Sequence, residues 1–185
     1  VTKQEMGEIR FKEMQCVEKT LGLGSMTVLD LPDGMLKQMN PIEIEQVVEE
    51  QIHRLRPDIL VTYAVHGISG FHDHLVTHAV VKRVYSKLTM NGAAYPRRLA
   101  LFTRMGEVKT DGKFRLEIST DEEIVFIEEC REEDMDKFRQ ALNCYKTYQE
   151  VIEASKVKEV TTRQVPFEIF GEEINGRLGS IAEGL

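Results

Sequence analysis

The chain has 185 residues, of which 42% are hydrophobic and 30% are charged, values typical of a globular protein that can bury a core within one domain. Its formal net charge of -7 argues against a protein that binds the nucleic-acid backbone, because such proteins depend on a basic surface. No apolar stretch approaches the ~18 residues of a membrane span, so no transmembrane helix is expected.

Three cysteines occur, at positions 16, 130 and 144. The number is odd, and the spacing does not match a metal-binding pattern. Free thiols persist in a reducing compartment, so the sequence predicts reduced cysteines and a cytoplasmic protein.

The first 55 residues predict a helix, a strand and a second helix. Apolar side chains recur at near-helical intervals over residues 4–21, and Gly22 ends that helix. Residues 26–29 form a short apolar run that predicts a strand, followed by a loop at 30–34. The Asn-Pro pair at 40–41 caps a helix that continues to about residue 55.

An alternation of strands and helices continues through residue 103. Residues 59–63 are almost entirely apolar, as in a strand buried on both faces of a parallel sheet. A glycine- and histidine-rich loop at 64–71 leads into a helix over 73–90, and residues 98–103 form the next strand. This order predicts an α/β fold, a Rossmann-like three-layer α/β/α sandwich with a mostly parallel sheet.

The pattern changes after residue 103. Short strand-like pieces surround an Asp-Gly pair at 111–112 and predict a hairpin. Residues 131–155 are strongly helical, and residues 165–170 form a late extended segment. No repeat or linker interrupts the chain, so residues 1–185 are predicted to form a single domain.

Four of the five histidines lie in the loop and helix that follow the predicted strand 59–63. Ligands of open α/β sheets bind outside the carboxyl ends of the strands, so chemistry is expected at this loop. His74 and His78 share one helix face. Imidazole suits zinc, and the neighbouring Asp73 could orient such a ligand. Alternatively these are polar loop residues, Asp73 caps the helix, and His78 is a packed helix histidine.

Four motifs follow one another along the chain: Arg10-x-x-Glu13, Asp30-Leu31-Pro32-Asp33-Gly34, Gly70-Phe71-His72-Asp73-His74, and Lys137-x-x-x-Ala141-Leu142 continued by Thr147-Tyr148-Gln149. In this order they resemble the PIG-L/LmbE-like family of zinc-dependent N-deacetylases. The resemblance covers nearly the whole chain.

The resemblance implies a hydrolase that removes an acetyl group from an N-acetylated sugar of the N-acetylglucosamine type. It implies a Zn²⁺ cofactor, or another divalent metal, with His74 as one ligand. A His and an Asp of an N-terminal His-Pro-Asp-Asp/Glu motif supply the other ligands in relatives, and the first Asp of that motif acts as general base. Arg10 and Asp33 match substrate-contacting positions, and relatives often form homo-oligomers.

The sequence departs from the family pattern at two points. The His-Pro-Asp-Asp/Glu motif does not occur in these 185 residues. Roughly one βαβ unit with the N-terminal strand, about 30 residues or more, is therefore expected either to lie upstream of Val1 or to be absent from this protein. The first histidine of the Gly-His-Pro-Asp-His motif is Phe71 here, and phenylalanine cannot stabilise an oxyanion or protonate an amine. We therefore assign catalytic roles to His72 and Asp73 and a substrate-binding role to His66, which could also replace the missing imidazole.

Two other functions remain open at this level. An altered or inactive carbohydrate-binding member of the same fold would explain Phe71 and the absent motif. A nucleotide-binding α/β domain of another class is less well supported, because no Gly-x-Gly-x-x-Gly, Walker or Gly-x-Ser-x-Gly loop occurs in the sequence.

Overall fold

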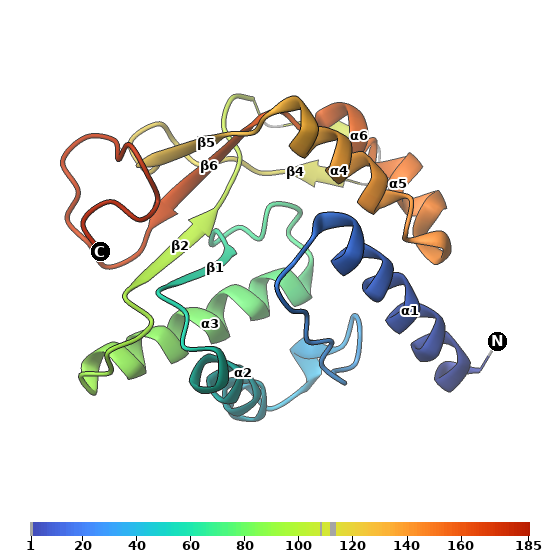
Figure 1. The fold of residues 1–185 in the computed structure, drawn as a ribbon, viewed down its shortest axis with the longest axis horizontal. Helices are drawn as coiled ribbons and strands as arrows, with labels where there is room; N and C mark the ends of the chain where they lie inside the picture. The colour runs from blue at the N-terminus through green and yellow to red at the C-terminus, as the bar shows by residue number, and fades with distance from the viewer. Residues whose placement is uncertain (1, 108, 112–113) are drawn as a thin grey trace. The chain divides into compact units, whose positions relative to one another are not determined.

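A computed structural model describes residues 2–107, 109–111 and 114–185 of the chain (Figure 1). The chain divides into two compact units. Unit 1 contains residues 1–30 and 129–164, and unit 2 contains residues 31–128 and 165–185. Each unit is described by itself.

Unit 1 is helical. Its helices are α1 (Lys3–Leu21), α4 (Glu132–Leu142), the 3-10 turn η2 (Lys146–Tyr148), α5 (Gln149–Ser155) and α6 (Val157–Val160). A capping box explains where α1 begins, because Thr2 Oγ1 accepts from Glu5 N at 3.2 Å and Glu5 Oε2 accepts from Thr2 N at 2.7 Å. Gly22 adopts φ +68° and ends the helix as predicted.

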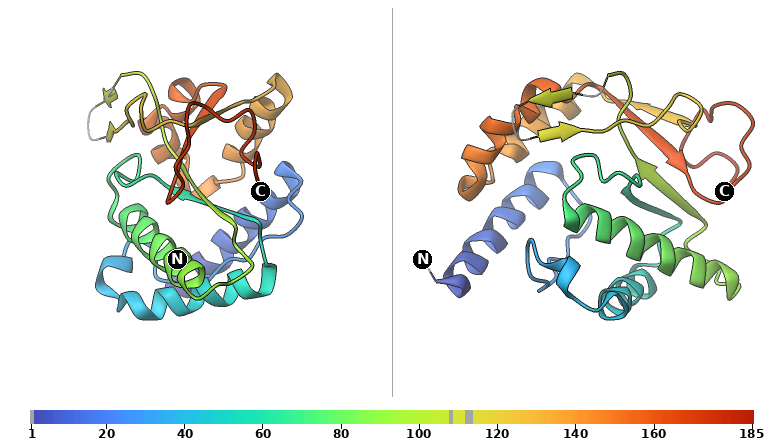
Figure 2. Two further views of the ribbon diagram at one scale, coloured as in Figure 1. Left: turned by 90° about the vertical axis from the view of Figure 1, so that its left-hand side faces the viewer. Right: turned by 180° about the vertical axis from the view of Figure 1, so that it is seen from behind.

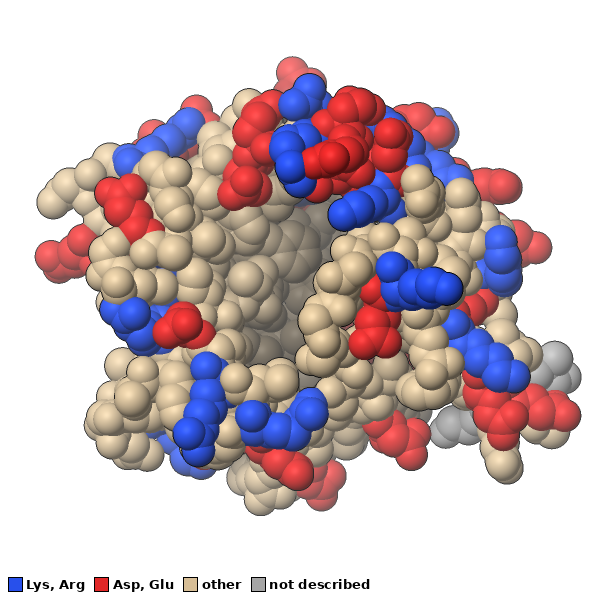
Figure 3. Space-filling view, in the orientation of Figure 1, with Lys and Arg blue, Asp and Glu red and all other residues tan. Residues whose placement is uncertain are grey.

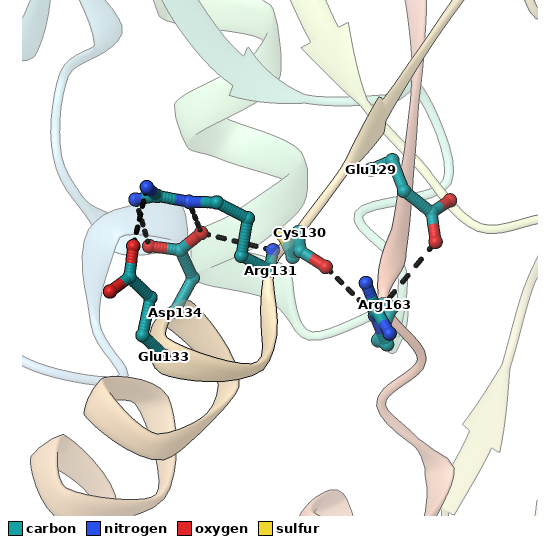
Figure 4. A network of polar contacts seen from close by, with 6 residues as sticks. All are labelled: Glu129, Cys130, Arg131, Glu133, Asp134 and Arg163. Carbon is teal, nitrogen blue, oxygen red and sulfur yellow. Dashed lines mark hydrogen bonds and ion pairs between the residues drawn. The ribbon is translucent and has the colours of Figure 1, made fainter.

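A second capping network fixes the start of α4 (Figure 4). Asp134 Oδ2 accepts from Arg131 N at 3.0 Å and from Arg131 Nε at 3.1 Å. These bonds to Arg131 lower the pKa of the Asp134 carboxyl. On the neighbouring segment, Arg163 Nε donates to the Cys130 carbonyl at 2.8 Å. The carboxylate of Asp134, in the first turn of α4, also interacts favourably with the dipole of that helix.

The predicted continuous helix over 131–155 is wrong in its middle. The helical path stops at Leu142 and resumes at Gln149, with η2 between. Gln149 Nε2 donates to the carbonyls of Leu142 (3.1 Å) and Tyr145 (2.7 Å). A side chain thus satisfies carbonyl groups that a continuous helix would have bonded internally.

Cys16 and Cys144 form a disulfide between α1 and the segment after α4. The prediction of three reduced thiols is therefore wrong for this pair, whereas Cys130 lies outside the disulfide and keeps its thiol. The half-cystines are separated by 128 positions in sequence, so their proximity was invisible in the local spacing. This finding removes the cysteine-based argument for a cytoplasmic location.

We expect Cys144→Ser to lower the unfolding free energy by about 2–5 kcal/mol, because the disulfide closes a long loop and restricts the unfolded chain. Thermal unfolding of the wild type with and without dithiothreitol measures the same effect. The matched control is Cys130→Ser, which removes the thiol outside the disulfide and should change the unfolding temperature little. Equal stability of the wild type and both variants, together with three reduced thiols in the wild type by mass spectrometry, would contradict the assignment of this disulfide.

Unit 2 is built on a four-stranded sheet with the order β1-β2-β6-β5. The strands are β1 (Ile59–Tyr63), β2 (Arg98–Phe102), β5 (Phe126–Glu129) and β6 (Gln164–Ile169), of which the terminal residues Glu129 and Gln164 belong to unit 1. Its helices are η1 (Leu36–Gln38), α2 (Pro41–Leu55) and α3 (His72–Met90). Strands β3 (Lys109–Asp111) and β4 (Phe114–Leu116) pair as the predicted hairpin, whose tip at 112–113 lies outside the described residues.

The α/β class is confirmed, but the sheet is mixed. Strands β1 and β2 are parallel, with Val61 opposite Ala100, whereas β2 and β6 are antiparallel. The strand–helix–strand rule predicts parallel pairing only for the stretch 59–103, where the elements alternate. Between β2 and β6 the chain forms a hairpin, the strand β5 and the helices of unit 1, not a single crossover helix. The expectation of a mostly parallel sheet is therefore not confirmed.

The core of unit 2 lies between its helices and the sheet. Helix α3 packs on β1 and β2 around Tyr85, Leu99 and Leu101, and α2 packs on α3 around Ile52 and Val84. Figures 1 and 2 show α2 and α3 side by side beneath these strands. A three-layer arrangement is not confirmed, because the described helices of this unit form only this one layer against the sheet.

The predicted strand over residues 26–29 is wrong. The segment has no regular secondary structure, and Val28 is 44% exposed. A strand requires a regular ladder of backbone hydrogen bonds with a neighbouring strand, and none of the sheets of the described residues includes residues 26–29. The apolar sequence was therefore insufficient to form the element.

None of the described helices is long and apolar enough to cross a bilayer. On the face shown in Figure 3, Lys and Arg side chains are interspersed with Asp and Glu. This face therefore carries charges of both signs.

Candidate functional site

His74 lies in the first turn of α3, where the loop after β1 fixes its ring. Its Nδ1 is 2.9 Å from the Gly67 carbonyl oxygen and 3.1 Å from Ser69 Oγ. A carbonyl oxygen only accepts hydrogen bonds, so Nδ1 carries the proton. In neutral imidazole this leaves the lone pair on Nε2, which has no hydrogen-bond partner among the described residues. His74 therefore presents an available donor atom for a cation.

Two aromatic rings hold the His74 imidazole in place. Tyr63, at the end of β1, stacks on it with ring centroids 4.1 Å apart and planes inclined by 11°. Phe71 meets it edge-on at 5.6 Å. Because stacking restricts rotation of the ring, these contacts reinforce the orientation set by the Gly67 carbonyl. Phe71 thus supports a neighbouring imidazole instead of supplying one.

The loop that holds His74 has an unusual backbone. Gly67 and Ile68 both adopt φ +63°, the left-handed region that a β-branched residue rarely enters. A Cβ at Gly67 would lie 2.9 Å from His74 Cβ, so only glycine fits this close approach. The loop is therefore tightly packed against the first turn of α3.

His66 bonds to this loop and to the end of β2. Its Nδ1 accepts from Ile68 N at 3.0 Å, so the ring proton lies on Nε2. That nitrogen is 3.2 Å from Thr103 Oγ1 and 3.3 Å from Ser119 Oγ. Both ring nitrogens of His66 therefore bond to groups of the protein itself. The sequence led us to expect that His66 binds the substrate, and a substrate-binding ring would keep one nitrogen available for it.

A chain of buried hydroxyl groups extends from His66 to a carboxylate. Thr103 Oγ1 lies 2.5 Å from Ser119 Oγ, which donates to Glu168 Oε1 at 2.5 Å. Burial lowers the pKa of His66 although Glu168 and other carboxylates act in the opposite direction. Because His66 Nδ1 accepts from Ile68 N, its Nε2 carries a proton and cannot accept the Ser119 proton, so this group lacks the arrangement of a serine-hydrolase triad.

Asp73 fixes a second loop to the start of α3. Its carboxylate accepts from Gly34 N at 2.7 Å and from Leu36 N at 3.2 Å. It does not cap its own helix, whose N-cap residue Phe71 has no side-chain cap bond. These bonds hold the backbone next to Asp33, which is exposed, against the first turn of α3. The structure thus brings Asp33, Asp73 and His74 together in unit 2.

The other two histidines of the motif region differ sharply. His72 is exposed at the first position of α3. His78 is 6% exposed, and its Nδ1 lies 2.7 Å from the Tyr63 carbonyl oxygen, to which it donates. His78 therefore has the packed environment considered from the sequence, whereas His72 is accessible to a ligand.

Arg10 belongs to a separate cluster in unit 1. Its guanidinium carbon lies 3.3 Å from the centroid of the Tyr148 ring, and its Nε is buried with no hydrogen-bond partner among the described atoms. Arg10 does not form an ion pair with Glu13, which lies three residues further along the same helix. The buried Glu13 carboxylate instead accepts from Thr147 N at 2.7 Å and Thr147 Oγ1 at 2.8 Å.

The described residues fit a metal only in part. His74 offers a correctly polarised ligand atom, but no group of three or more His, Cys, Asp or Glu side chains able to hold a metal ion occurs in the part of the chain that the structure describes. A catalytic zinc needs three protein ligands. Further ligands must come from elsewhere if His74 holds zinc.

The sequence motifs do not include the side chains that hold His74 and His66 in place. These side chains come from separate segments and belong to no motif: Tyr63, Ser69, Thr103, Ser119 and Glu168. The position of Tyr63 and Thr103 at the ends of two adjacent parallel strands was the one available signal, because such ends meet at the same sheet edge.

Residues 1–85 match the family model of PIG-L, described as GlcNAc-PI de-N-acetylase. The matched stretch contains α1 with Arg10, the loop with Asp33 and the first turns of α3 with His74. The match covers the first three of the four motifs and supports the resemblance over these residues, which are similar to a family described as de-N-acetylases. No curated protein matches the chain.

Proposed function

We propose that this protein is a zinc-dependent N-deacetylase that hydrolyses the acetamide of an N-acetylglucosamine-type sugar. The observation that carries the proposal is the state of His74, with its Nδ1 proton donated to the Gly67 carbonyl and Nε2 left available. Histidines that bind metals in proteins almost always use this arrangement.

The remaining zinc ligands are proposed to come from a His-Pro-Asp-Asp/Glu segment that precedes Val1, as in the family that the chain resembles. Residues 1–185 would then be one deacetylase domain that lacks its N-terminal strand and metal motif, and the added strand would extend a Rossmann-like sheet. The encoding gene tests this directly. An upstream His-x-Asp-Asp/Glu is expected, and an upstream sequence without acidic or histidine ligands would contradict it.

Zinc in such a site polarises an amide carbonyl and activates water for attack near neutral pH. His74 would bind the ion, and the Asp73-bound loop with Asp33 would contact the sugar. Arg10 would bind a polar or anionic group of the substrate, because its guanidinium lies over the Tyr148 ring and its Nε has no hydrogen-bond partner among the described atoms. His72 would protonate the departing amine, since it is exposed and the neighbouring Phe71 cannot.

Metal analysis of the full-length protein, combined with an assay for amine release from N-acetylglucosamine derivatives, tests the proposal. Stoichiometric zinc and amine release are expected. A metal-free protein that binds such sugars without releasing amine would instead support the inactive carbohydrate-binding alternative, which the Phe71 substitution favours.

His72→Ala is expected to lower turnover by about 10²- to 10⁴-fold, the usual contribution of a general acid, while zinc content stays unchanged. Because this side chain is exposed, its removal should leave the unfolding temperature at the wild-type value. His53→Ala, another histidine but on α2, serves as the matched control and should retain full turnover. Unchanged turnover in His72→Ala would remove this residue from the reaction.

A further inference from the structure

His66 is connected to His74 through the backbone of the loop between them. The first connection is the bond from Ile68 N to His66 Nδ1 at 3.0 Å. The second is the bond from His74 Nδ1 to the carbonyl of Gly67, the residue directly before Ile68. The peptide unit that joins Gly67 to Ile68 therefore bonds to one imidazole through its carbonyl and to the other through its N–H group.

This peptide unit requires stabilisation from outside. Ile68 adopts φ +63°, a conformation that costs an L-residue free energy and persists only where the surroundings enforce it. The bond to His66 is one such constraint. A second is the bond from Glu117 N to the Ile68 carbonyl at 2.8 Å. Without the His66 acceptor, Ile68 is expected to relax toward negative φ, which rotates the Gly67 carbonyl away from His74.

His66 is itself anchored at its other nitrogen. Its Nε2 proton is donated toward Thr103 Oγ1 and Ser119 Oγ, two side chains that are each 4% exposed. Ser119 is held in turn by Glu168. The ring therefore lies at a fixed position relative to β2 and β6, and its Nδ1 lone pair is aimed at the loop.

We propose that His66 is a positioning residue, which fixes the protonated Nδ1 and the ring orientation of His74 through the peptide unit between Gly67 and Ile68. The inference rests on the proposed zinc site and adds a residue to it. His66 contacts neither metal nor substrate in this role. It transmits the geometry of the sheet to the ligand atom Nε2 of His74.

Two substitutions separate the two bonds of His66. His66→Asn keeps an acceptor near the position of Nδ1, because an asparagine oxygen readily accepts from the N–H group two residues on. His66→Gln places its amide nitrogen near the position of Nε2 and so keeps the donor toward Thr103 and Ser119, but it withdraws the acceptor from Ile68. The two variants are otherwise matched in polarity.

The first readout needs no metal. Long-range ¹⁵N spectra of histidine-labelled full-length protein report which ring nitrogen carries the proton, and a His74→Ala spectrum assigns the signals. We expect His74 protonated at Nδ1 in the wild type and in His66→Asn, and a mixture of both tautomers in His66→Gln. Thermal unfolding confirms that each variant is folded.

The second readout is zinc affinity, measured by competition with a chromophoric chelator. His66→Gln should bind zinc about 10- to 100-fold more weakly, the effect typical of losing a group that orients a metal ligand. His66→Asn should stay near the wild type. Adding Ile68→Gly to His66→Gln should recover much of the loss, because glycine adopts positive φ without enforcement.

A His66→Gln protein with the wild-type His74 tautomer and the wild-type zinc affinity would overturn the inference. So would equal losses in His66→Asn and His66→Gln that Ile68→Gly does not relieve, because these would mean that the whole network only supports the fold. A wild type that binds no zinc, but in which the His74 tautomer still depends on His66, would overturn the proposed function and support the positioning of the ring.

Discussion

His74→Ala is expected to reduce the zinc affinity of the full-length protein by more than about 100-fold and to abolish amine release. Loss of a group that merely orients a metal ligand costs about 10- to 100-fold in affinity, so loss of the ligand atom itself must cost more. A catalytic zinc site with three protein ligands retains only two in this variant. Metal content after dialysis and competition with a chelator measure the change.

His72→Ala is the matched control for metal retention, because it removes an imidazole two residues away that is exposed and faces another side of α3. It should keep its zinc. Equal losses of zinc from both variants would show that the ligand has been assigned to the wrong residue. His78→Ala is unsuitable as a control, because it empties a buried site and removes the hydrogen bond to Tyr63.

The sequence singled out His74 as the proposed metal ligand, but it could not predict which ring nitrogen of His74 carries the proton. A histidine cluster after an apolar strand, together with the family motif, identified His74. The protonation of Nδ1 follows from a backbone carbonyl seven residues earlier, and that contact depends on the left-handed backbone of Gly67 and Ile68. No periodicity or motif encodes such a turn when one of its residues is isoleucine.

Contacts across long sequence separations were also beyond prediction. Thr103 and Ser119 meet at His66, and Glu168 at Ser119, only because the sheet and its following loops bring them together. The Cys16–Cys144 disulfide depends in the same way on the packing of α1 against α4. The segment 26–29 shows the opposite failure, since its local pattern favoured a strand but pairing with the rest of the chain decides strand formation.

Gly67→Ala is expected to lower the unfolding free energy by about 2–5 kcal/mol and to weaken zinc binding. Two costs add. An L-residue at φ +63° costs about 1–2 kcal/mol. The new methyl group would also lie 2.9 Å from His74 Cβ and 3.1 Å from Leu75 Cδ2, an overlap of the kind that costs about 1–3 kcal/mol in a packed region. Because His74 Cβ cannot swing aside like the end of a long side chain, the overlap shifts the imidazole itself.

Gly70→Ala separates these two costs. Gly70 adopts φ +69° in the same loop, but a Cβ there meets no described atom within 4 Å. This variant should therefore lose only the conformational contribution, about 1–2 kcal/mol, and should keep its zinc affinity. Urea unfolding and chelator competition on both variants give the comparison. Equal destabilisation with equal zinc affinity would mean that the close approach of Gly67 to α3 does not position His74, whereas the larger loss in Gly67→Ala follows if it does.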